Sequence, residues 1–183
     1  MIDSSASKPE ISVPDISVVV PVHDESGAAV PLAREIAEAF AGRSYEMIFV
    51  NDASRDSTLA ELQAAMAELP ALRVLSHATN AGQSRAVRTG VLAARAPIVV
   101  TLDGDGQNPP ADAPRLAGAL IAAPPSVAPV GGGRAKRQDS NAKRQASLWA
   151  NRIRKKLLSD DADDTGCGLK AFRRDVFLRL PYF

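Results

Sequence analysis

Residues 98–105 have the sequence Ile-Val-Val-Thr-Leu-Asp-Gly-Asp, an apolar, β-branched run that ends in two carboxylates around a glycine. The run is short and rich in β-branched residues, so it predicts a buried strand. Similar runs occur before it, and a weaker one follows. The predicted strands are Ile16–Val22, Tyr45–Val50, Leu72–Ser76, Ile98–Leu102 and Val127–Val130.

The segments between these strands carry apolar residues at helical spacing. The predicted helices are Val30–Ala41, Ser57–Leu69, Gln83–Ala94 and Pro110–Ala122. Asp56 or Ser57 is a candidate cap for the second helix, and Pro110 suits the first turn of the fourth. Because strands and helices alternate with short connections, the sequence predicts an α/β fold with a mostly parallel central sheet and helices on both faces.

Length and composition exclude several classes of protein. The 183 residues are 45% hydrophobic, enough for one domain with its own core, and the net charge of +1 indicates no particular partner. No apolar run approaches the roughly 18 residues needed to span a bilayer. The polar segment Met1–Pro14 does not resemble a signal peptide, and we expect a loose arm there. Cys167 is the only cysteine, so no disulfide forms within the chain, which fits a reducing cytoplasm.

Polar residues follow strands or strand-like runs at four places. In mostly parallel sheets, ligands bind beyond the carboxyl ends of the strands. We therefore expect these four clusters to lie at one ligand-binding edge. They are His23-Asp24-Glu25, Asn51-Asp52, Asn80-Ala81-Gly82-Gln83 and Asp103-Gly104-Asp105.

The pair Asp103 and Asp105 is a candidate metal site. Mg²⁺ and Mn²⁺ prefer oxygen ligands and complete their shell with phosphate and water, and two carboxylates two residues apart can approach one ion. Two other interpretations are a surface Asp-Gly turn and a calcium loop. The further acids of an EF-hand loop are missing, which disfavours the calcium loop.

Each of the other clusters has a binding and a structural interpretation. Glu25 and Asp52 are candidates to accept hydrogen bonds from a base or ribose, but acids at these positions also cap helices, and this structural interpretation applies more strongly to Asp56. The helix after Gly82 could attract an anion at its N-terminus, or Gly82 could simply form a turn at positive φ. Arg134, after three glycines, is a candidate phosphate ligand.

The segment Arg134–Lys156 contains nine Lys or Arg and one acid, Asp139. Its apolar residues fall on one helical face around Trp149, as in helices that lie on anionic membranes or bind a lipid phosphate. A solvated charged helix is the competing interpretation. Nucleic-acid binding is disfavoured because no DNA- or RNA-binding motif is present. No Gly-x-Gly-x-x-Gly follows the first strand, which argues against a dinucleotide-dependent dehydrogenase.

Taken in order, these motifs resemble the family 2 glycosyltransferases with a GT-A fold, and within them the polyprenyl-phosphate branch typified by dolichol-phosphate mannosyltransferase. His23, Asn51 and Ala53 differ from the tyrosine, aspartate and glycine usual in that family. The matching pieces are Val-Val-Val-Pro21-Val-His-Asp-Glu25, Phe-Val-Asn-Asp52-Ala-Ser-Arg-Asp-Ser-Thr58, Asn80-Ala-Gly-Gln-Ser, Leu-Asp103-Gly-Asp105-Gly-Gln107-Asn-Pro-Pro110, Gly133-Arg134, Asn151 and Asp164-Thr-Gly-Cys-Gly168-Leu-Lys170-Ala-Phe-Arg173.

The resemblance implies an inverting transfer of a hexose from a nucleotide-diphosphate sugar, such as GDP-mannose or a UDP-sugar, to a polyprenyl phosphate with Mg²⁺ or Mn²⁺ as cofactor. It implies metal ligands at Asp103 and Asp105 and acceptor-phosphate ligands at Arg134 and Lys170. The catalytic residues that it implies are Asp105, Asp164 and Arg134. The implied nucleotide-sugar site consists of Pro21, Val22, Glu25, Asn51, Asp52, Asp103, Gly104 and Gln107.

By the same resemblance, residues 1–183 are expected to form one catalytic domain. Residues 134–183 would be its acceptor-side, membrane-proximal part, ending earlier than in relatives. The expected location is cytoplasmic, peripheral on the inner face of the cell membrane, with Arg134–Lys156 on the membrane surface. The alternative is a truncated, non-catalytic module that binds nucleotide sugars or the membrane. The sequence leaves the sugar, the base and the oligomeric state open.

Overall fold

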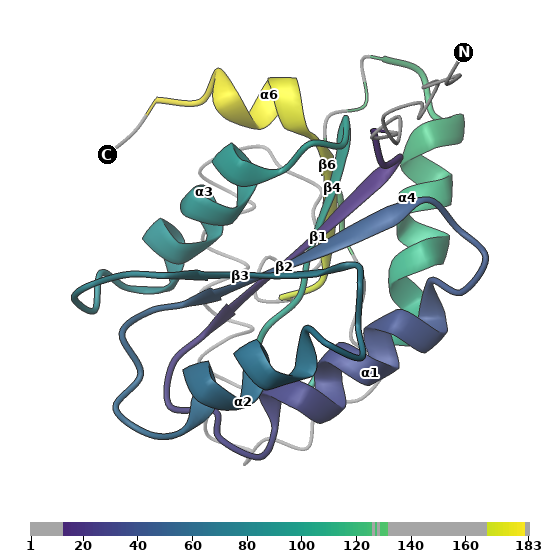
Figure 1. The fold of residues 1–183 in the computed structure, drawn as a ribbon. Coiled ribbons are helices and arrows are strands. Elements are labelled where there is room, and N and C mark those ends of the chain that lie inside the picture. The colour runs from purple at the N-terminus through teal and green to yellow at the C-terminus, as the bar shows by residue number, and fades with distance from the viewer. Residues whose placement is uncertain (1–12, 126, 128, 132–167, 182–183) are drawn as a thin grey trace, which may run out of the picture.

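The computed structural model describes residues 13–125, 127, 129–131 and 168–181. These residues form a six-stranded sheet in the order β3-β2-β1-β4-β6-β5 with helices on both faces (Figure 1). The strands are β1 (Ile16–Val22), β2 (Tyr45–Asn51), β3 (Leu72–Ser76), β4 (Ile98–Thr101), β5 (Pro129–Gly131) and β6 (Lys170–Arg173). The helices are α1 (Ala29–Ala39), α2 (Thr58–Ala65), α3 (Gln83–Ala93), the 3₁₀ turn η1 (Pro110–Asp112), α4 (Ala113–Ala122) and α6 (Arg174–Leu178).

The sheet is mostly parallel, as predicted. Strands β3, β2, β1 and β4 run in the same direction, so their carboxyl ends meet at one edge. Strand β6 lies antiparallel between β4 and β5, with Thr101 opposite Lys170. The start of β6 therefore lies at the same edge of the sheet as the end of β4.

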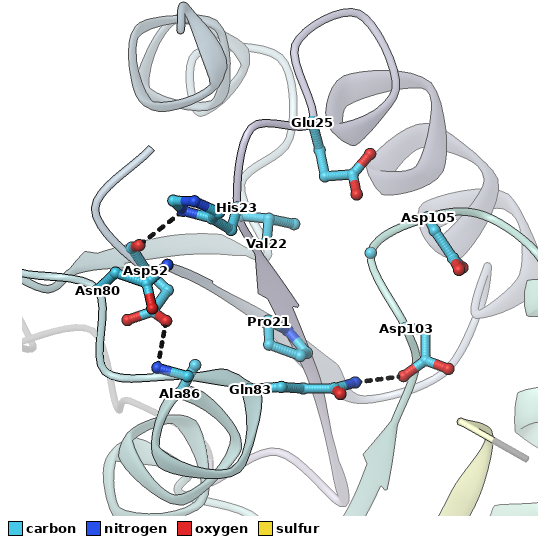
Figure 2. Close-up of a pocket in the computed structure, with 12 residues that line it drawn as sticks. Pro21, Val22, His23, Glu25, Asp52, Asn80, Gln83, Ala86, Asp103 and Asp105 are labelled. Atoms are coloured by element: carbon cyan, nitrogen blue, oxygen red, sulfur yellow. Dashed lines mark hydrogen bonds between the residues drawn. The ribbon is translucent and has the colours of Figure 1, made fainter. Parts of the chain in front are cut away.

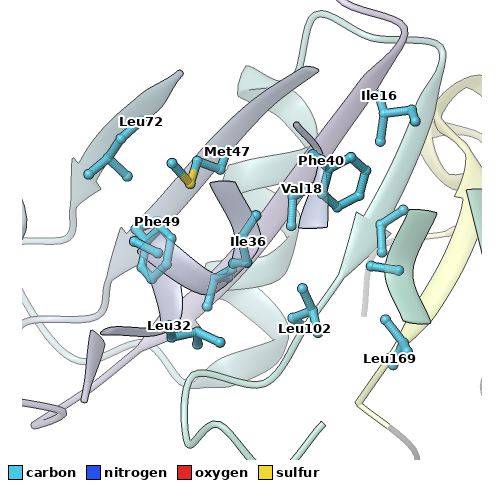
Figure 3. Close-up of a cluster of buried hydrophobic side chains, with 14 of the residues drawn as sticks. Ile16, Val18, Leu32, Ile36, Phe40, Met47, Phe49, Leu72, Leu102 and Leu169 are labelled. Atoms are coloured by element: carbon cyan, nitrogen blue, oxygen red, sulfur yellow. The ribbon is translucent and has the colours of Figure 1, made fainter. Parts of the chain in front are cut away.

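Two apolar layers cover the two faces of the sheet. One layer packs α1, α2 and α4 against side chains such as Val18 and Phe49, and Figure 3 shows this cluster. The other packs α3, with α6 beside it, against side chains such as Val19 and Ile48. Neighbouring residues along β1 and β2 point into opposite layers, and both layers consist of buried apolar side chains. This two-sided burial explains why these strands are continuous apolar runs rather than alternating ones.

Helix α2 and strand β6 differ most from the sequence prediction, which also did not include helix α6. Helix α2 ends at Ala65, four residues before the predicted Leu69, because the next residues form i→i+3 turns such as Glu68 N to Ala65 O (3.1 Å). Strand β6 was not predicted at all. Its short sequence Lys-Ala-Phe-Arg has no apolar run, and pairing with β4 and β5 gives it its strand conformation. Among the described residues, no helix is both long enough and apolar enough to cross a bilayer.

A buried carboxylate lies near the end of β2 that is remote from the ligand edge. The side chain of Glu46, in a residue only 1% exposed, accepts hydrogen bonds from Ser17 Oγ (2.7 Å) and from the Arg95 backbone N–H (2.7 Å). Its other oxygen accepts from Arg73 Nη1 (2.6 Å) and Arg95 Nε (3.0 Å). The carboxylate thus ties β1, β2, β3 and the segment before β4 together, and both its oxygens are satisfied.

We expect Glu46→Ala to lower the free energy of unfolding by about 3 kcal/mol, because it leaves a buried hydroxyl, an amide and two guanidinium groups without their acceptor. Urea denaturation measures this change. The exposed pair Arg34–Glu68 (3.1 Å) provides the control, and Glu68→Ala should cost less than about 1 kcal/mol. Equal losses for the two variants would contradict a special role for the buried carboxylate.

The same carboxylate gives the stability a pH dependence. Burial alone would raise the pKa of Glu46, but the hydrogen bonds from Arg95, Ser17 and Arg73 outweigh it and hold the pKa below the ordinary value of 4.5. The folded form therefore binds the proton less tightly than the unfolded chain. The stabilisation from Glu46 is fully present above pH 4.5 and is lost as the pH falls through the lowered pKa. The free energy of unfolding of Glu46→Ala should therefore fall less steeply with decreasing pH than that of the wild type.

Candidate functional site

A pocket of about 400 Å³ opens at the carboxyl ends of β1, β2 and β4 and at the start of α3 (Figure 2). All four polar clusters predicted for this edge contribute to it. Seven of the residues proposed from sequence line it directly. The lining residues are Pro21, Val22, His23, Glu25, Asp52, Asn80, Gly82, Gln83, Ala86, Asp103, Gly104 and Asp105.

Hydrogen bonds hold the loop after β1 against the loop after β2, and this fixes the wall of the pocket that carries Glu25. Backbone N–H groups of the first loop donate to side chains of the second. The donor–acceptor pairs are Asp24 N to Ser54 Oγ (3.0 Å), Glu25 N to Thr58 Oγ1 (2.9 Å), Ser26 N to Asp56 Oδ2 (3.0 Å) and Gly27 N to Glu61 Oε2 (2.8 Å).

Asp56 has a structural role at the start of α2, although the N-cap position belongs to Ser57 and has no side-chain cap hydrogen bond. Asp56 accepts hydrogen bonds from the hydroxyl and the backbone N–H of Thr58, the first residue of α2, and both bonds lower the pKa of its carboxyl. It does not line the pocket. Ala53, which replaces the family's usual glycine, has a φ of +56°. That conformation favours glycine, which is a physical reason for glycine at this position.

Asp52 lies under the opposite wall of the pocket and is 3% exposed. Its Oδ1 accepts from the Ala81 N–H (2.9 Å) and pairs with His77 Nδ1 (2.7 Å), and its Oδ2 accepts from the Gly82 N–H (2.7 Å). Burial opposes ionisation, but these hydrogen bonds outweigh it and lower the pKa of Asp52. Gly82 has a φ of +86°, so the predicted glycine turn is present.

Three carboxylates occupy the other side of the pocket. In Figure 2, Asp103 and Asp105 lie opposite His23 and Asp52, with Glu25 near Asp105. Asp103 Oδ1 accepts from Gln83 Nε2 (2.8 Å), and Asp105 Oδ1 accepts from the Gln107 N–H (3.0 Å). Burial raises the pKa of Glu25, and repulsion from Asp105 and then from Asp56 raises it further. This concentration of negative charge favours a bound cation.

Two glycines allow the backbone to pack closely around these acids. A Cβ on Gly104 would stand 2.5 Å from the carbonyl oxygen of Pro21 and 2.7 Å from Val22 Cγ1, so only glycine lets the end of β4 approach the end of β1. A Cβ on Gly168 would overlap the carboxylate of Asp103. Gly168, just before β6, therefore lies directly against Asp103.

The acids fit a divalent cation that is only partly held by protein. No group of three or more His, Cys, Asp or Glu is placed to enclose a metal within the described part of the chain. Mg²⁺ and Mn²⁺ sites that bind phosphates use one or two carboxylates and leave the remaining positions to phosphate oxygens and water. Asp103 and Asp105, hard oxygen donors on the pocket wall, match that pattern.

The remaining predicted site residues lie elsewhere. Asn51 is buried beside the pocket, where its side chain donates to Ser76 Oγ (2.9 Å), and Gln107 is exposed beyond Asp105. Neither lines the pocket. Lys170 is exposed at the start of β6, at the ligand edge. The predictions for Arg134, Asp164 and the basic segment 134–156 lie outside the described residues.

The sequence reasoning missed two contributors to this site. His77 contacts Asp52 from the residue just after β3, and Gly168 makes room for Asp103. The strand-end rule could have found His77, because it follows the run Leu72–Ser76 directly. Gly168 belongs to one of the matching motifs, but its contact with Asp103 has no local signal, because the two residues are far apart in the sequence.

Comparison with known proteins identifies relatives over nearly the whole chain. The sequence model of Glycosyl transferase family 2 matches residues 17–180. An undecaprenyl-phosphate 4-deoxy-4-formamido-L-arabinose transferase from Shewanella sediminis is 36% identical over 166 residues, covering 88% of this chain and 49% of the relative. The transferase of the same name from Pseudomonas aeruginosa is 38% identical, with 88% and 48% covered. The chain thus spans about half the length of these relatives.

Solved structures show the same fold. A mannosyltransferase from Pyrobaculum calidifontis, in complex with GDP-Man and Mn²⁺, has a TM-score of 0.71 at 22% identity and covers 94% of this chain and 48% of its own. A glucosyl-3-phosphoglycerate synthase from Mycobacterium tuberculosis, in complex with Mn²⁺ and UDP, has a TM-score of 0.71 at 20% identity, with 92% and 60% covered. The α/β prediction and its GT-A form are confirmed. The acid pair and the pocket lie at the carboxyl ends of a mostly parallel sheet. Because the family model matches residues 17–180, this chain belongs to glycosyl transferase family 2.

Proposed function

We propose that this chain belongs to an enzyme that transfers a sugar, with inversion, from a nucleotide-diphosphate sugar to a polyprenyl phosphate. The observation that carries this proposal is a single pocket with a wall around Asp52 and an acidic wall at Asp103 and Asp105. The curated relatives, named as undecaprenyl-phosphate sugar transferases, support the acceptor class. Residues 1–183 would then form one catalytic domain.

The two walls suit the two ends of a donor. Pro21, Val22 and Asp52 would contact the base and ribose, as would Glu25 from the margin of the acidic wall. Asn51 would act indirectly, by holding Ser54 and Ser76 in place.

Asp103, Gly104 and Asp105 would face the diphosphate, with Gln107 beside them. A Mg²⁺ or Mn²⁺ ion held by Asp103 and Asp105 would neutralise the charge that develops on the departing diphosphate.

The transfer itself requires little from a general base. An oxygen of the acceptor phosphate attacks the anomeric carbon, the bond from that carbon to the diphosphate oxygen breaks, and its electron pair stays on the nucleotide diphosphate. The acceptor phosphate is already anionic at neutral pH, so the protein must position it rather than deprotonate it. We assign Lys170 and Arg134 to that phosphate and Asp164 to the orientation of the acceptor.

A polyprenyl phosphate resides in a membrane, so we place the reaction at a membrane surface, on the inner face of the cell membrane. The basic segment Arg134–Lys156 would contact anionic head groups there. The described residues would supply the donor pocket and Lys170, which is exposed at the same edge of the sheet.

A thermal-shift panel of nucleotide diphosphates tests the donor half of the proposal. GDP or UDP with Mn²⁺ should raise the melting temperature, and the same nucleotide with EDTA should raise it much less. At a free ligand concentration about 100 times Kd, the stabilisation is about 2.7 kcal/mol. Transfer of radiolabelled sugar to undecaprenyl phosphate tests the acceptor half. Binding without transfer would favour the non-catalytic alternative, and a panel without any metal-dependent shift would refute the donor site.

A further inference from the structure

We propose that His77, held by Thr89, is a positioning residue that fixes the carboxylate of Asp52 for ligand binding. This inference rests on the proposed function in one respect, because it takes Asp52 to contact the nucleotide. His77 follows β3, and Thr89 lies on α3, so neither residue belongs to the loops that line the pocket around Glu25.

The hydrogen bonds of His77 select one form of its ring. Its Nδ1 lies 2.7 Å from Asp52 Oδ1, and its Nε2 lies 2.9 Å from Thr89 Oγ1. An ionised carboxylate only accepts hydrogen bonds, so Nδ1 must carry the proton. In the neutral ring, Nε2 then accepts from the hydroxyl of Thr89. The carboxylate of Asp52 therefore selects the tautomer in which His77 donates to it, and the hydroxyl of Thr89, which can donate or accept, holds the ring from the other side.

The surroundings of His77 and Asp52 restrict the movement of both side chains. The side chain of His77 is 17% exposed and that of Asp52 5%, so water competes little for their hydrogen bond. Asp52 Oδ1 accepts from both His77 and the Ala81 N–H, while Oδ2 accepts from the Gly82 N–H. These bonds prevent rotation of the carboxylate. Oδ1 is fully engaged, and Oδ2 retains acceptor capacity for a ligand.

The same contacts connect the pocket to α3. Ala81 and Gly82 immediately precede this helix, and Thr89 lies within it. Asp52 therefore holds the start of α3, and His77 holds the helix further along at Thr89. Gln83, at the start of the helix, donates to Asp103 on the other wall of the pocket. A loosened Asp52 would disturb both walls, and we expect this to appear in ligand affinity.

The test compares isosteric and conservative variants at the two positions. Thr89→Val keeps the shape and removes the hydroxyl, and Thr89→Ser restores it. His77→Leu removes both ring nitrogens, and His77→Asn keeps a donor near the position of Nδ1. Calorimetry with GDP and UDP in Mn²⁺ should show Kd weakened about tenfold by His77→Leu and about threefold by Thr89→Val, with rescue by the conservative variants.

A double mutant separates a positioning role from a packing role. If Thr89 acts through His77, Thr89→Val should add little to Kd when His77 is already Leu. Additive effects would contradict that dependence. Melting temperatures are measured in parallel, and variants that lower them but leave Kd unchanged would show that the two residues only stabilise the fold.

Amide hydrogen exchange gives a readout that needs no ligand. The Ala81 and Gly82 amides donate to Asp52, so their protection should fall in Thr89→Val and in His77→Leu, while the amides of β1 stay protected. If wild type binds neither GDP nor UDP, the proposed function fails while exchange still decides whether His77 positions Asp52. Unchanged protection of Ala81 and Gly82 in both variants would overturn the proposal.

Discussion

Asp105→Asn is expected to reduce kcat/KM for sugar transfer roughly 10²- to 10³-fold while the protein stays folded. The side chain is exposed at the pocket wall, so the loss of its charge costs little stability. As a proposed metal ligand, Asp105 would help hold the cation that stabilises the departing diphosphate, and a single such electrostatic contact is worth that much in rate. Transfer assays over a Mn²⁺ titration, with melting curves alongside, measure both quantities.

Asp175→Asn is the matched control. Asp175 is an exposed acid on α6 that pairs with Arg179 (3.3 Å), and it does not line the pocket. Its substitution removes the same charge from the protein and should leave both rate and metal dependence unchanged. If Asp105→Asn retains the wild-type rate and the wild-type Mn²⁺ requirement, the assignment of Asp105 as a metal ligand is wrong.

Gly168→Ala is expected to lower transfer roughly 10²-fold, although it adds only a methyl group. That methyl would overlap the carboxylate of Asp103, so either the acid or the strand entering β6 must move. A displacement of about 1 Å at a catalytic group can cost this much in rate. Calorimetric titration of Mn²⁺ in the presence of GDP or UDP should show the weakened metal site directly.

Gly118→Ala supplies the comparison, because nothing lies within 4 Å of a Cβ at that helical position. It should leave activity unchanged and stabilise α4 by up to about 1 kcal/mol through helix propensity. Gly168→Ala with full activity would mean that the segment before β6 does not constrain Asp103.

The sequence predicted the sheet well where apolar runs are continuous. The bounds of β1 were correct because a strand buried in a parallel sheet is a continuous apolar run bounded by polar turns, and those of the partly buried edge strand β3 were also correct. Strand β6 could not be predicted from its own sequence, because pairing with β4, and not its composition, makes it a strand. The end of α2 was misplaced because Met66 and Leu69 continue the helical spacing through residues that form turns.

The site was predictable to the extent that it follows the ends of strands. Glu25, Asp52, Asp103 and Asp105 were selected by that rule, and all four line one pocket. Contacts between side chains distant in sequence, such as His77 with Thr89 or Gly168 with Asp103, have no local signature. The assignments of Arg134 and Asp164 stay predictions.

The place of β6 in the sheet has a consequence for biosynthesis. Thr101 and Gly168, which share a hydrogen bond, are separated by 67 residues. At about 5–20 residues per second, the ribosome releases β4 several seconds before the strand that covers its edge. The apolar edge of β4 is exposed on the nascent chain during that interval, when it can pair with other chains. The hydrogen bonds around Asp52 can form early, because their donors precede β4 in the chain. The surroundings of Asp103 are completed only after Gly168 and β6 have been synthesised.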